Sequence, residues 1–507
     1  MAGMSEKQHK AEHRNRPTGE AFMAFMREGW APRSSELPEL TEAARYAAAR
    51  RETLSAAYPG ERLVVPAGGL KIRSNDTDYV FRPHSAFAHL TGLGADREPD
   101  AVLVLEPVAD GEGHEACLYF VPLADRDSED FFADSRSGEF WVGSRPTLAS
   151  AAAELGMPTR HLSELPDALA KDVGPSGLAV RVVRDADREV AQQVDEARAQ
   201  GGLGSQAQVD ASTEADLELA RTLSTQRMVK DDWEVAQMQE AVDATATAFD
   251  AVVEHLPEAV RRGRGERWVE GVFGLHARHA GNGVGYDSIC AAGDHATTLH
   301  WIRNTGDVAD GQLLLLDAGV ETDALYTADV TRTVPVSGTF TEPQRRVYDA
   351  VLEAQEAGLA AVRPGNRFQD VHAAAIEVIA RHLLDWGLLP DDVTLEQTLD
   401  AKEGQFHRRW MVHGTSHHLG IDVHDCAQAL REDYVEGELR EGMVLTVEPG
   451  LYFKADDLLV PEELRGIGVR IEDDVVVTAD GSRNLSAMLP RTADEVEAWV
   501  RAGGRRG

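Results

Sequence analysis

Short apolar runs and amphipathic stretches alternate along the first part of the chain. The apolar runs are bounded by glycine and proline, which predicts buried strands, and the Ala-, Arg- and Glu-rich stretches predict helices. The predicted strands are residues 62–68, 101–107, 116–123 and 178–183, and the predicted helices are residues 40–58 and 149–156. This alternation predicts a separate α/β domain. It contains no glycine-rich loop of the nucleotide-binding type.

The second part of the chain has longer periodic segments. From residue 232, Val235, Met238, Val242, Phe249 and Val253 recur at helical spacing and predict one buried helix face. Three further helices are predicted: one after Thr341, with Pro343 in its first turn, that ends before Pro364, one over 368–386, and a short C-terminal one over 492–502. The strands are predicted over 312–320, 443–453 and 468–478.

These segments predict a mixed α/β (α+β) protein with two main domains. The predicted organisation is an N-terminal extension (1–38), an N-terminal α/β domain (39–190), a helical linker (191–226), a large second domain (227–490) and a C-terminal helix and tail (491–507).

Charge and cysteine content restrict the possible partners. The chain has 86 acidic and 51 basic residues, a formal charge of −35, which argues against nucleic acid or an anionic membrane as a partner. Three widely spaced cysteines predict no disulfide framework and indicate a reducing compartment. No apolar run approaches the roughly 18 residues of a membrane span, and no signal peptide is evident. We therefore expect a cytoplasmic protein.

Four acidic residues occur where the pattern predicts buried strands or their ends: Asp317, Asp329, Glu448 and Glu472. A buried carboxylate is costly unless a positive partner meets it. Three histidines at 413, 417 and 424 lie in the segment just before Glu448. Carboxylates with a single imidazole suit Mn²⁺, Co²⁺ or Fe²⁺ better than a thiolate zinc site, and this many ligands suit two metals about 3.5–4 Å apart.

Several motifs carry a family resemblance. The segments DAG (317–319), ADVTRTVPVSG (328–338), HGTSHHLGIDVHD (413–425), TVEPGLY (446–452) and RGIGVRIEDDV (465–475) resemble the proline-specific pita-bread metallopeptidases, and most closely the aminopeptidase P (Xaa-Pro aminopeptidase) group. The segment YVFRPHSAFAHLTGLGADREPDAVLVL in the N-terminal part resembles the creatinase-type domain of the same family.

The resemblance implies specific roles for individual residues. In the family, five ligands hold two Mn²⁺-type ions, with Co²⁺, Fe²⁺ or Zn²⁺ as alternatives. The implied metal ligands are Asp317, Asp329, His417, Glu448 and Glu472; the implied catalytic residues are His424, His413, Glu448 and His300; the implied substrate-binding residues are Arg470, Tyr452, His300 and His413. The spacing between Asp317 and Asp329 is about one residue longer than the family pattern.

The resemblance also implies an activity. A metal-bridging hydroxide would attack the first peptide bond of a peptide with proline second, and Glu448 would transfer the proton. One alternative is a prolidase restricted to Xaa-Pro dipeptides. Another is a metal-free binding module on the same fold, which the complete ligand set argues against. Because family members commonly assemble, we expect a homodimer or homotetramer.

Overall fold

The computed structural model describes residues 19–75, 77–109 and 113–504. It divides into two compact units, one of residues up to 87 with 96–210, the other of residues 88–95 with those from 211 onward. The boundary at residue 210 falls inside helix α10 (Gln206–Arg227). Of the predicted N-terminal extension, residues 1–18 lie outside the described residues, and the remainder contains helix α2 (Glu20–Arg27).

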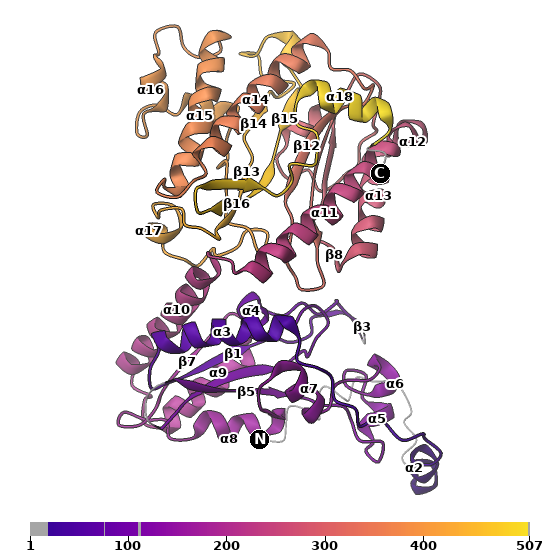
Figure 1. The fold of residues 1–507 in the computed structure, drawn as a ribbon, viewed down its shortest axis with the longest axis vertical. Coiled ribbons are helices and arrows are strands. Elements are labelled where there is room, and N and C mark those ends of the chain that lie inside the picture. The colour runs from indigo at the N-terminus through magenta and orange to yellow at the C-terminus, as the bar shows by residue number, and fades with distance from the viewer. Residues whose placement is uncertain (1–18, 76, 110–112, 505–507) are drawn as a thin grey trace. The chain divides into compact units, whose positions relative to one another are not determined.

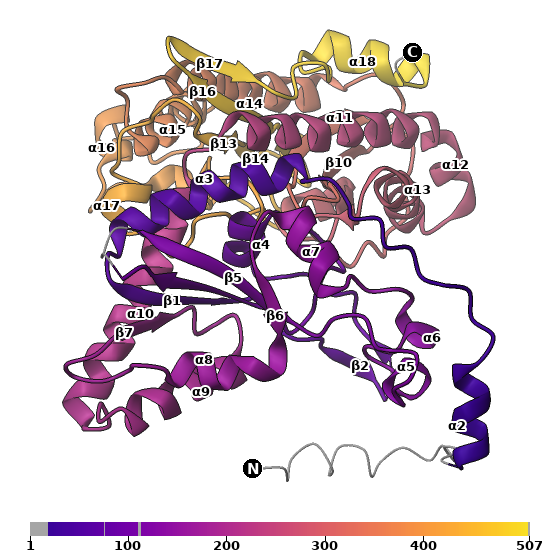
Figure 2. The ribbon, with the colours of Figure 1, turned by 60° about the horizontal axis from the view of Figure 1, so that its bottom comes forward.

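The first unit is built on a five-stranded sheet in the order β6-β5-β4-β1-β7. Strand β4 pairs antiparallel with β1 and β5, whereas the edge strands β7 and β6 pair parallel. Both Figure 1 and Figure 2 show α3 on one face of this sheet and α8 and α9 on the other. The strands are β1 (Glu61–Pro66), β4 (Val102–Pro107), β5 (His114–Phe120), β6 (Thr159–His161) and β7 (Ala179–Val182); the helices are α3 (Glu42–Ala57), α7 (Leu148–Leu155), α8 (Leu165–Ala170) and α9 (Arg188–Gln200). This mixed α/β arrangement confirms the predicted fold class.

The second unit combines small antiparallel sheets with long helices. Strand β10 lies between β12 and β9, β16 lies between β13 and β17, and β14 pairs with β15. Helix α14 packs beside α15, and the C-terminal α18 packs against α11 and α14 (Figure 2). The strands are β9 (Ile289–Ala292), β10 (Leu313–Ala318), β12 (Val330–Pro335), β13 (Val444–Val447), β14 (Gly450–Tyr452), β15 (Gly468–Arg470), β16 (Asp473–Thr478) and β17 (Gly481–Asn484); the helices are α11 (Asp232–Glu254), α13 (Gly265–Ala280), α14 (Glu342–Ala361), α15 (Phe368–Asp385) and α18 (Ala493–Ala502).

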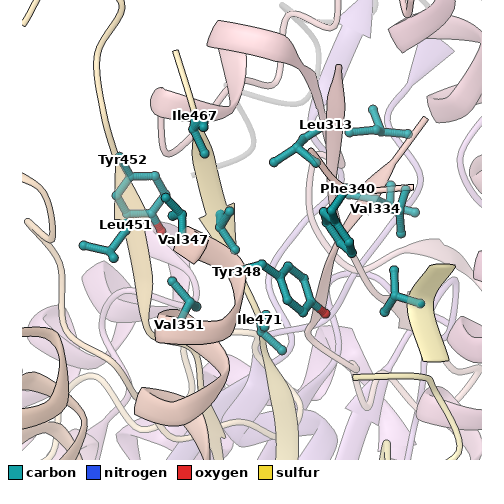
Figure 3. Packing of buried hydrophobic residues seen from close by; sticks show 14 of the residues in the cluster. Leu313, Val334, Phe340, Val347, Tyr348, Val351, Leu451, Tyr452, Ile467 and Ile471 are labelled. Atoms are coloured by element: carbon teal, nitrogen blue, oxygen red, sulfur yellow. The ribbon is translucent and has the colours of Figure 1, made fainter. Parts of the chain in front are cut away.

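Local chemistry explains where the long helices begin. Thr341 caps α14 in a reciprocal capping box with Gln344, and Pro343 occupies the first turn, where its missing N–H costs nothing. Along the inner face of this helix, Val347 and Val351 are fully buried beside Leu451 of β14 (Figure 3). Burying an apolar side chain of this size contributes about 1.5–3 kcal/mol, so packing rather than helix propensity holds α14 in place.

The segment predicted as one strand over 443–453 is interrupted. Strand β13 ends at Val447 and β14 begins at Gly450, so Glu448 lies in the break between them. Pro449 has no N–H for a ladder, and the N–H of Glu448 donates to the carbonyl oxygen of Thr415 at 2.8 Å. The pairing partner therefore changes from β16 to β15, and the break turns the Glu448 carboxylate toward a cavity.

Within the described residues, no helix combines the length and the apolar character that crossing a membrane would require.

Candidate active site

The second unit encloses a cavity of about 590 Å³. It gathers residues from β10, from the breaks that flank β12, β14 and β16, and from the loop between residues 413 and 424. The predicted site residues that line it are His300, Asp317, Asp329, His413, His417, His424, Glu448, Arg470 and Glu472. The structure thus brings together side chains that are far apart in the sequence.

Three of these residues form the centre of the site. Ligand atoms of Asp329, His417 and Glu472 all lie within 4.8 Å of one another. The His417 Nε2 is 3.3 Å from Asp329 Oδ2 and 3.8 Å from Glu448 Oε1. Its Nδ1 is 3.2 Å from the carbonyl oxygen of His418, so Nδ1–H donates there and leaves Nε2 facing the carboxylates. This is the orientation that a metal-ligating imidazole requires.

Asp317 lies beside this centre and is held by two donors. Arg470 Nη2 donates to Asp317 Oδ2, and Tyr286 donates from its hydroxyl to Asp317 Oδ1 at 2.6 Å. The same hydroxyl contacts Asp329 Oδ1, so one phenolic proton serves two carboxylates. Burial, together with Asp317 and Asp329, raises the pKa of Tyr286 well above its ordinary value, which keeps the hydroxyl a donor. Despite the added residue in the intervening segment, Asp317 and Asp329 both face the cavity.

The carboxylates crowd one another in a poorly solvated space. Burial raises the pKa of Glu448 to about 8, although the positive charges of His417 and Arg470 act to lower it. Burial and the neighbouring carboxylates raise the pKa of Glu472 well above its usual range, and the pKa of Asp317 is raised mainly by burial. Burial alone would lower the pKa of His417, but hydrogen bonding and charge from Asp329, and the charge of Glu448, raise it to about 9.

This donor set fits divalent metal ions. At the centre of the site, four carboxylates lie near one guanidinium and the imidazole of His417, and a cluster with that excess of acidic groups is costly to bury without further cations. Carboxylate oxygens with an imidazole nitrogen are ligands that divalent ions of the Mn²⁺ type accept.

A second layer of residues, not predicted from the sequence, orients the carboxylates. The buried Asp474 accepts the N–H of Asp329 at 3.0 Å, and the hydroxyl of Thr331 donates to Glu472 Oε2 at 2.7 Å. Tyr286, in the segment GYDSIC, belongs to the same layer. The sequence signal for Asp474 is its place in the consecutive acids of RIEDDV, where the third acid of that run lies at the start of an apolar strand.

His413 forms one side of the cavity with a defined tautomer. Its Nδ1–H donates to the carbonyl oxygen of Gly414 at 2.6 Å, so its Nε2 accepts from the hydroxyl of Tyr452 at 2.7 Å. Arg470 Nη1 donates to the same hydroxyl at 3.1 Å. Burial and the charge of Arg470 lower the pKa of His413 to about 3, so this imidazole is neutral.

Tyr452, predicted to contact substrate, lies behind this wall. It is only 5% exposed and is not among the residues that line the cavity. Figure 3 shows its ring packed among Leu451, Val347 and other buried residues. Its hydroxyl bridges His413 and Arg470, so in this structure it supports residues of the cavity wall.

His424 and His300 are the exposed imidazoles of the cavity. The His424 ring stands edge-on to His417, with ring centroids 4.4 Å apart at 80°. Burial and the charge of His417 lower the pKa of His424, which favours its neutral form. His300 lies on a loop with Leu299 and Ile302, which add apolar surface to the same cavity. The cavity is therefore lined by imidazoles and apolar side chains as well as by carboxylates.

Comparisons with known proteins cover nearly the whole chain. Residues 236–479 match metallopeptidase family M24, and residues 47–179 match the aminopeptidase P N-terminal domain. The "Xaa-Pro aminopeptidase 1" of Streptomyces coelicolor is 52% identical over 479 residues, covering 94% of this chain and 91% of the relative. The "Xaa-Pro aminopeptidase" of Escherichia coli is 33% identical over 467 residues, covering 90% and 97%.

Solved structures give the same pattern. Aminopeptidase P from E. coli in its low-pH form superposes with a TM-score of 0.77 at 31% identity, covering 92% of this chain and 99% of that chain. An aminopeptidase from Pseudomonas aeruginosa superposes with a TM-score of 0.76 at 30% identity, with the same coverage.

Proposed function

The chain belongs to the Xaa-Pro aminopeptidases of metallopeptidase family M24, as its motifs predicted, and from this premise we propose how its own residues carry out the reaction. The substrates are peptides with proline in the second position. We propose that hydrolysis depends on a pair of divalent metal ions, with Mn²⁺ as the preferred ion. The observation that carries this proposal is the grouping of Asp329, His417 and Glu472 within 4.8 Å, flanked by Asp317 and Glu448.

The proposed ligands are the five residues implied by the resemblance: Asp317, Asp329, His417, Glu448 and Glu472. When bound, two divalent ions supply an ionised water as nucleophile at neutral pH and polarise the scissile carbonyl. The Tyr286 hydroxyl lies between the carboxylates of Asp317 and Asp329, and the Thr331 hydroxyl donates to that of Glu472, which fixes these oxygen atoms before the ions bind. Asp474 accepts the backbone N–H of Asp329 and so holds the main chain of that ligand.

Glu448 is the proposed proton carrier. Its Oε2 lies 3.6 Å from Nδ1 of His413 and its Oε1 faces His417, so the carboxylate lies between the centre of the site and its wall. As a metal ligand Glu448 is ionised, and a carboxylate in that position can take a proton from the attacking water and return it to the leaving nitrogen. His424, neutral and exposed to the cavity, is the proposed donor to the developing oxyanion.

The wall formed by His300, Leu299 and Ile302 suits the proline side of the substrate. The nitrogen of an Xaa-Pro bond carries no N–H, so recognition must rely on shape and apolar contact rather than on a hydrogen bond to that nitrogen. His413, on the opposite segment, adds a neutral ring with its hydrogen bonds already made.

Peptide cleavage with and without metal tests the proposal. We expect the chelated protein to be inactive, Mn²⁺ to restore cleavage of Ala-Pro-Ala, and Ala-Ala-Ala to be cleaved poorly. Glu448→Gln should lose at least about 100-fold in kcat, whereas Glu441→Gln, an exposed glutamate just before β13, should not. Full activity after exhaustive chelation would refute the metal assignment.

Adding the dipeptide Ala-Pro and longer Xaa-Pro peptides to this set decides between the two substrate classes. Cleavage of Ala-Pro-Ala and longer peptides supports an aminopeptidase, whereas cleavage restricted to Ala-Pro supports the prolidase alternative. Assembly into a homodimer or homotetramer stays a prediction, which light scattering would check. The cytoplasmic location also stays a prediction.

A further inference from the structure

Glu266 is a buried glutamate in the first turn of α13, with an exposed fraction of 0%. Its carboxylate accepts hydrogen bonds from four donors, all in the segment 292–306. The donors are the N–H of Ala292 at 2.9 Å, Nδ1 of His295 at 2.7 Å, Nε1 of Trp301 at 2.9 Å and the N–H of Gly306 at 2.5 Å. One side chain therefore holds both ends and the middle of a single loop.

This loop forms part of the cavity. It leaves β9 at Ala292, makes a short 3-10 turn over Gly293–Thr297, and carries Leu299, His300 and Ile302 to the cavity wall. Ile302 is 46% exposed, so it has limited packing of its own. The position of these wall residues consequently depends on the backbone that carries them.

Neighbouring contacts make the arrangement specific. The His295 and Trp301 rings stack with centroids 3.9 Å apart, and Glu266 returns a backbone hydrogen bond from its own N–H to the carbonyl oxygen of Gly306. A Cβ on Gly306 would lie 2.8 Å from the Glu266 carboxyl carbon and 2.7 Å from the His295 ring. The backbone at 306 can approach the carboxylate only because residue 306 is glycine.

The end of the loop is anchored separately. The Asn304 side chain accepts the N–H of Cys290 at 3.0 Å and donates to the carbonyl oxygen of Ser288 at 2.9 Å. These bonds attach the loop to β9 and to the residue before it. The wall residues lie between the end of β9 at Ala292 and the anchored Asn304. Glu266 holds this part of the loop through its hydrogen bonds with His295 and Trp301.

A carboxylate is the group that this set of contacts requires. All its partners are donors, and an ionised carboxylate only accepts. The amide of glutamine has the same shape but presents N–H groups to some of these donors, which leaves buried donors unpaired. The substitution therefore changes hydrogen bonding with little change in volume.

We propose that Glu266 is a positioning residue that sets the proline-side wall of the cavity by holding the loop 292–306. It touches neither substrate nor the metal ligands; it acts through His300 and Ile302. Binding of the proline ring depends on the distance between this wall and the opposite one, so a looser loop weakens binding and lowers the preference for proline. This inference rests on the proposed function.

Glu266→Gln tests the inference, with Glu234→Gln as the matched control. Glu234 is also buried in the first turn of a long helix, α11, and accepts a hydrogen bond from the Tyr326 hydroxyl. Glu234 and Tyr326 do not line the cavity. For Glu266→Gln we expect KM for Ala-Pro-Ala to rise about tenfold, as one lost hydrogen bond to a charged group allows, with kcat changed less than about threefold. We also expect faster amide hydrogen exchange at Ala292 and Gly306. Glu234→Gln should show neither change.

Trp301→Phe is a second variant, which keeps an aromatic ring beside His295 and removes the indole N–H that donates to Glu266. It should shift KM in the same direction by a smaller factor, and it decides the matter if Glu266→Gln does not fold. Wild-type KM in the tested variant, unchanged exchange over 292–306, or equal effects of Glu266→Gln and Glu234→Gln would overturn the inference. If the wild-type protein cleaves no Xaa-Pro peptide, the proposed function fails, whereas the exchange data still decide whether Glu266 holds the loop.

Discussion

Metal binding to this site should release protons, and the number can be worked from the structure. At pH 7 a carboxyl with a pKa of about 8, as for Glu448, holds its proton in about nine molecules of ten. An imidazole with a pKa of about 9, as for His417, holds its second proton almost always. Both groups must give up these protons to become ligands, so binding should release about two protons at pH 7.

The same arithmetic predicts how the release changes with pH. At pH 8.5 the two groups together hold about one proton, so the release should fall to about one. The raised pKa values of Glu472 and Asp317 can only add to the number, because a proton on either carboxylate must also leave.

Titration calorimetry measures this release directly. Mn²⁺ is added to the metal-free protein in buffers with different enthalpies of ionisation, and the slope of observed heat against that enthalpy gives the protons released. Glu448→Gln should remove about one proton at pH 7, whereas the exposed Glu441→Gln should leave the number unchanged. A release below about half a proton at pH 7 in the wild type would refute the reasoning.

Three further predictions concern stability. The free energy of unfolding of the metal-free protein should fall as pH rises from 6.5 to 8, because Glu448 and His417, whose pKa values are raised, hold more protons in the folded state than in the unfolded state. Each extra proton lowers this free energy by about 1.4 kcal/mol per pH unit. Urea unfolding midpoints that do not change over this pH range would contradict the prediction. Arg332→Met should lower the free energy of unfolding in urea by about 3 kcal/mol or more. The reason is that Arg332 is fully buried and donates to Asp473 at 2.7 Å and to several carbonyl oxygens. A loss below about 1 kcal/mol would show that this ion pair contributes little to stability. Gly319→Ala should lower the free energy of unfolding by about 1–3 kcal/mol and weaken Mn²⁺ binding in calorimetry, because the added Cβ would lie 1.6 Å from a backbone oxygen. Gly271→Ala is the control, since a Cβ at that position meets open space. Equal effects of the two substitutions would exclude the steric cause.

The helices with strong local signals were predicted well. The segment after Thr341 carries a capping box and an apolar face, and α14 occupies Glu342–Ala361. In α11, Met238, Val242, Phe249 and Val253 are buried as their spacing predicts, whereas Val235, the first of the predicted set, is only half-buried. These signals are local, since capping and periodicity involve residues a few positions apart.

Helix α13 (Gly265–Ala280) shows where local signals are insufficient. Its sequence contains three glycines, which weaken any helical pattern, and no helix was predicted there. Contacts with another helix compensate: Phe273 packs edge-on against Phe249, with ring centroids 5.9 Å apart. The stabilising partner is distant in the sequence, so the local pattern could not reveal it.

The sequence by itself determined the chemical content of the site. Its carboxylates at strand ends and its histidine run predicted a metal centre, and its motifs predicted the family. Those features can be recognised in the sequence because they consist of particular residue types at fixed short spacings. The order of apolar and amphipathic segments likewise determined the mixed α/β class.

Only the tertiary structure decided how these groups meet. Arg470 reaches Asp317 across 153 positions, and Tyr286 places one hydroxyl between Asp317 and Asp329. Tyr452, expected to bind substrate, lies behind the residues that line the cavity. Glu266 gains its four donors in the same way. Such contacts depend on strand register and loop path, and a shift of one residue would turn a strand residue such as Asp317 or Arg470 to the other face of its strand. Local sequence does not encode that register, because packing between distant segments selects it.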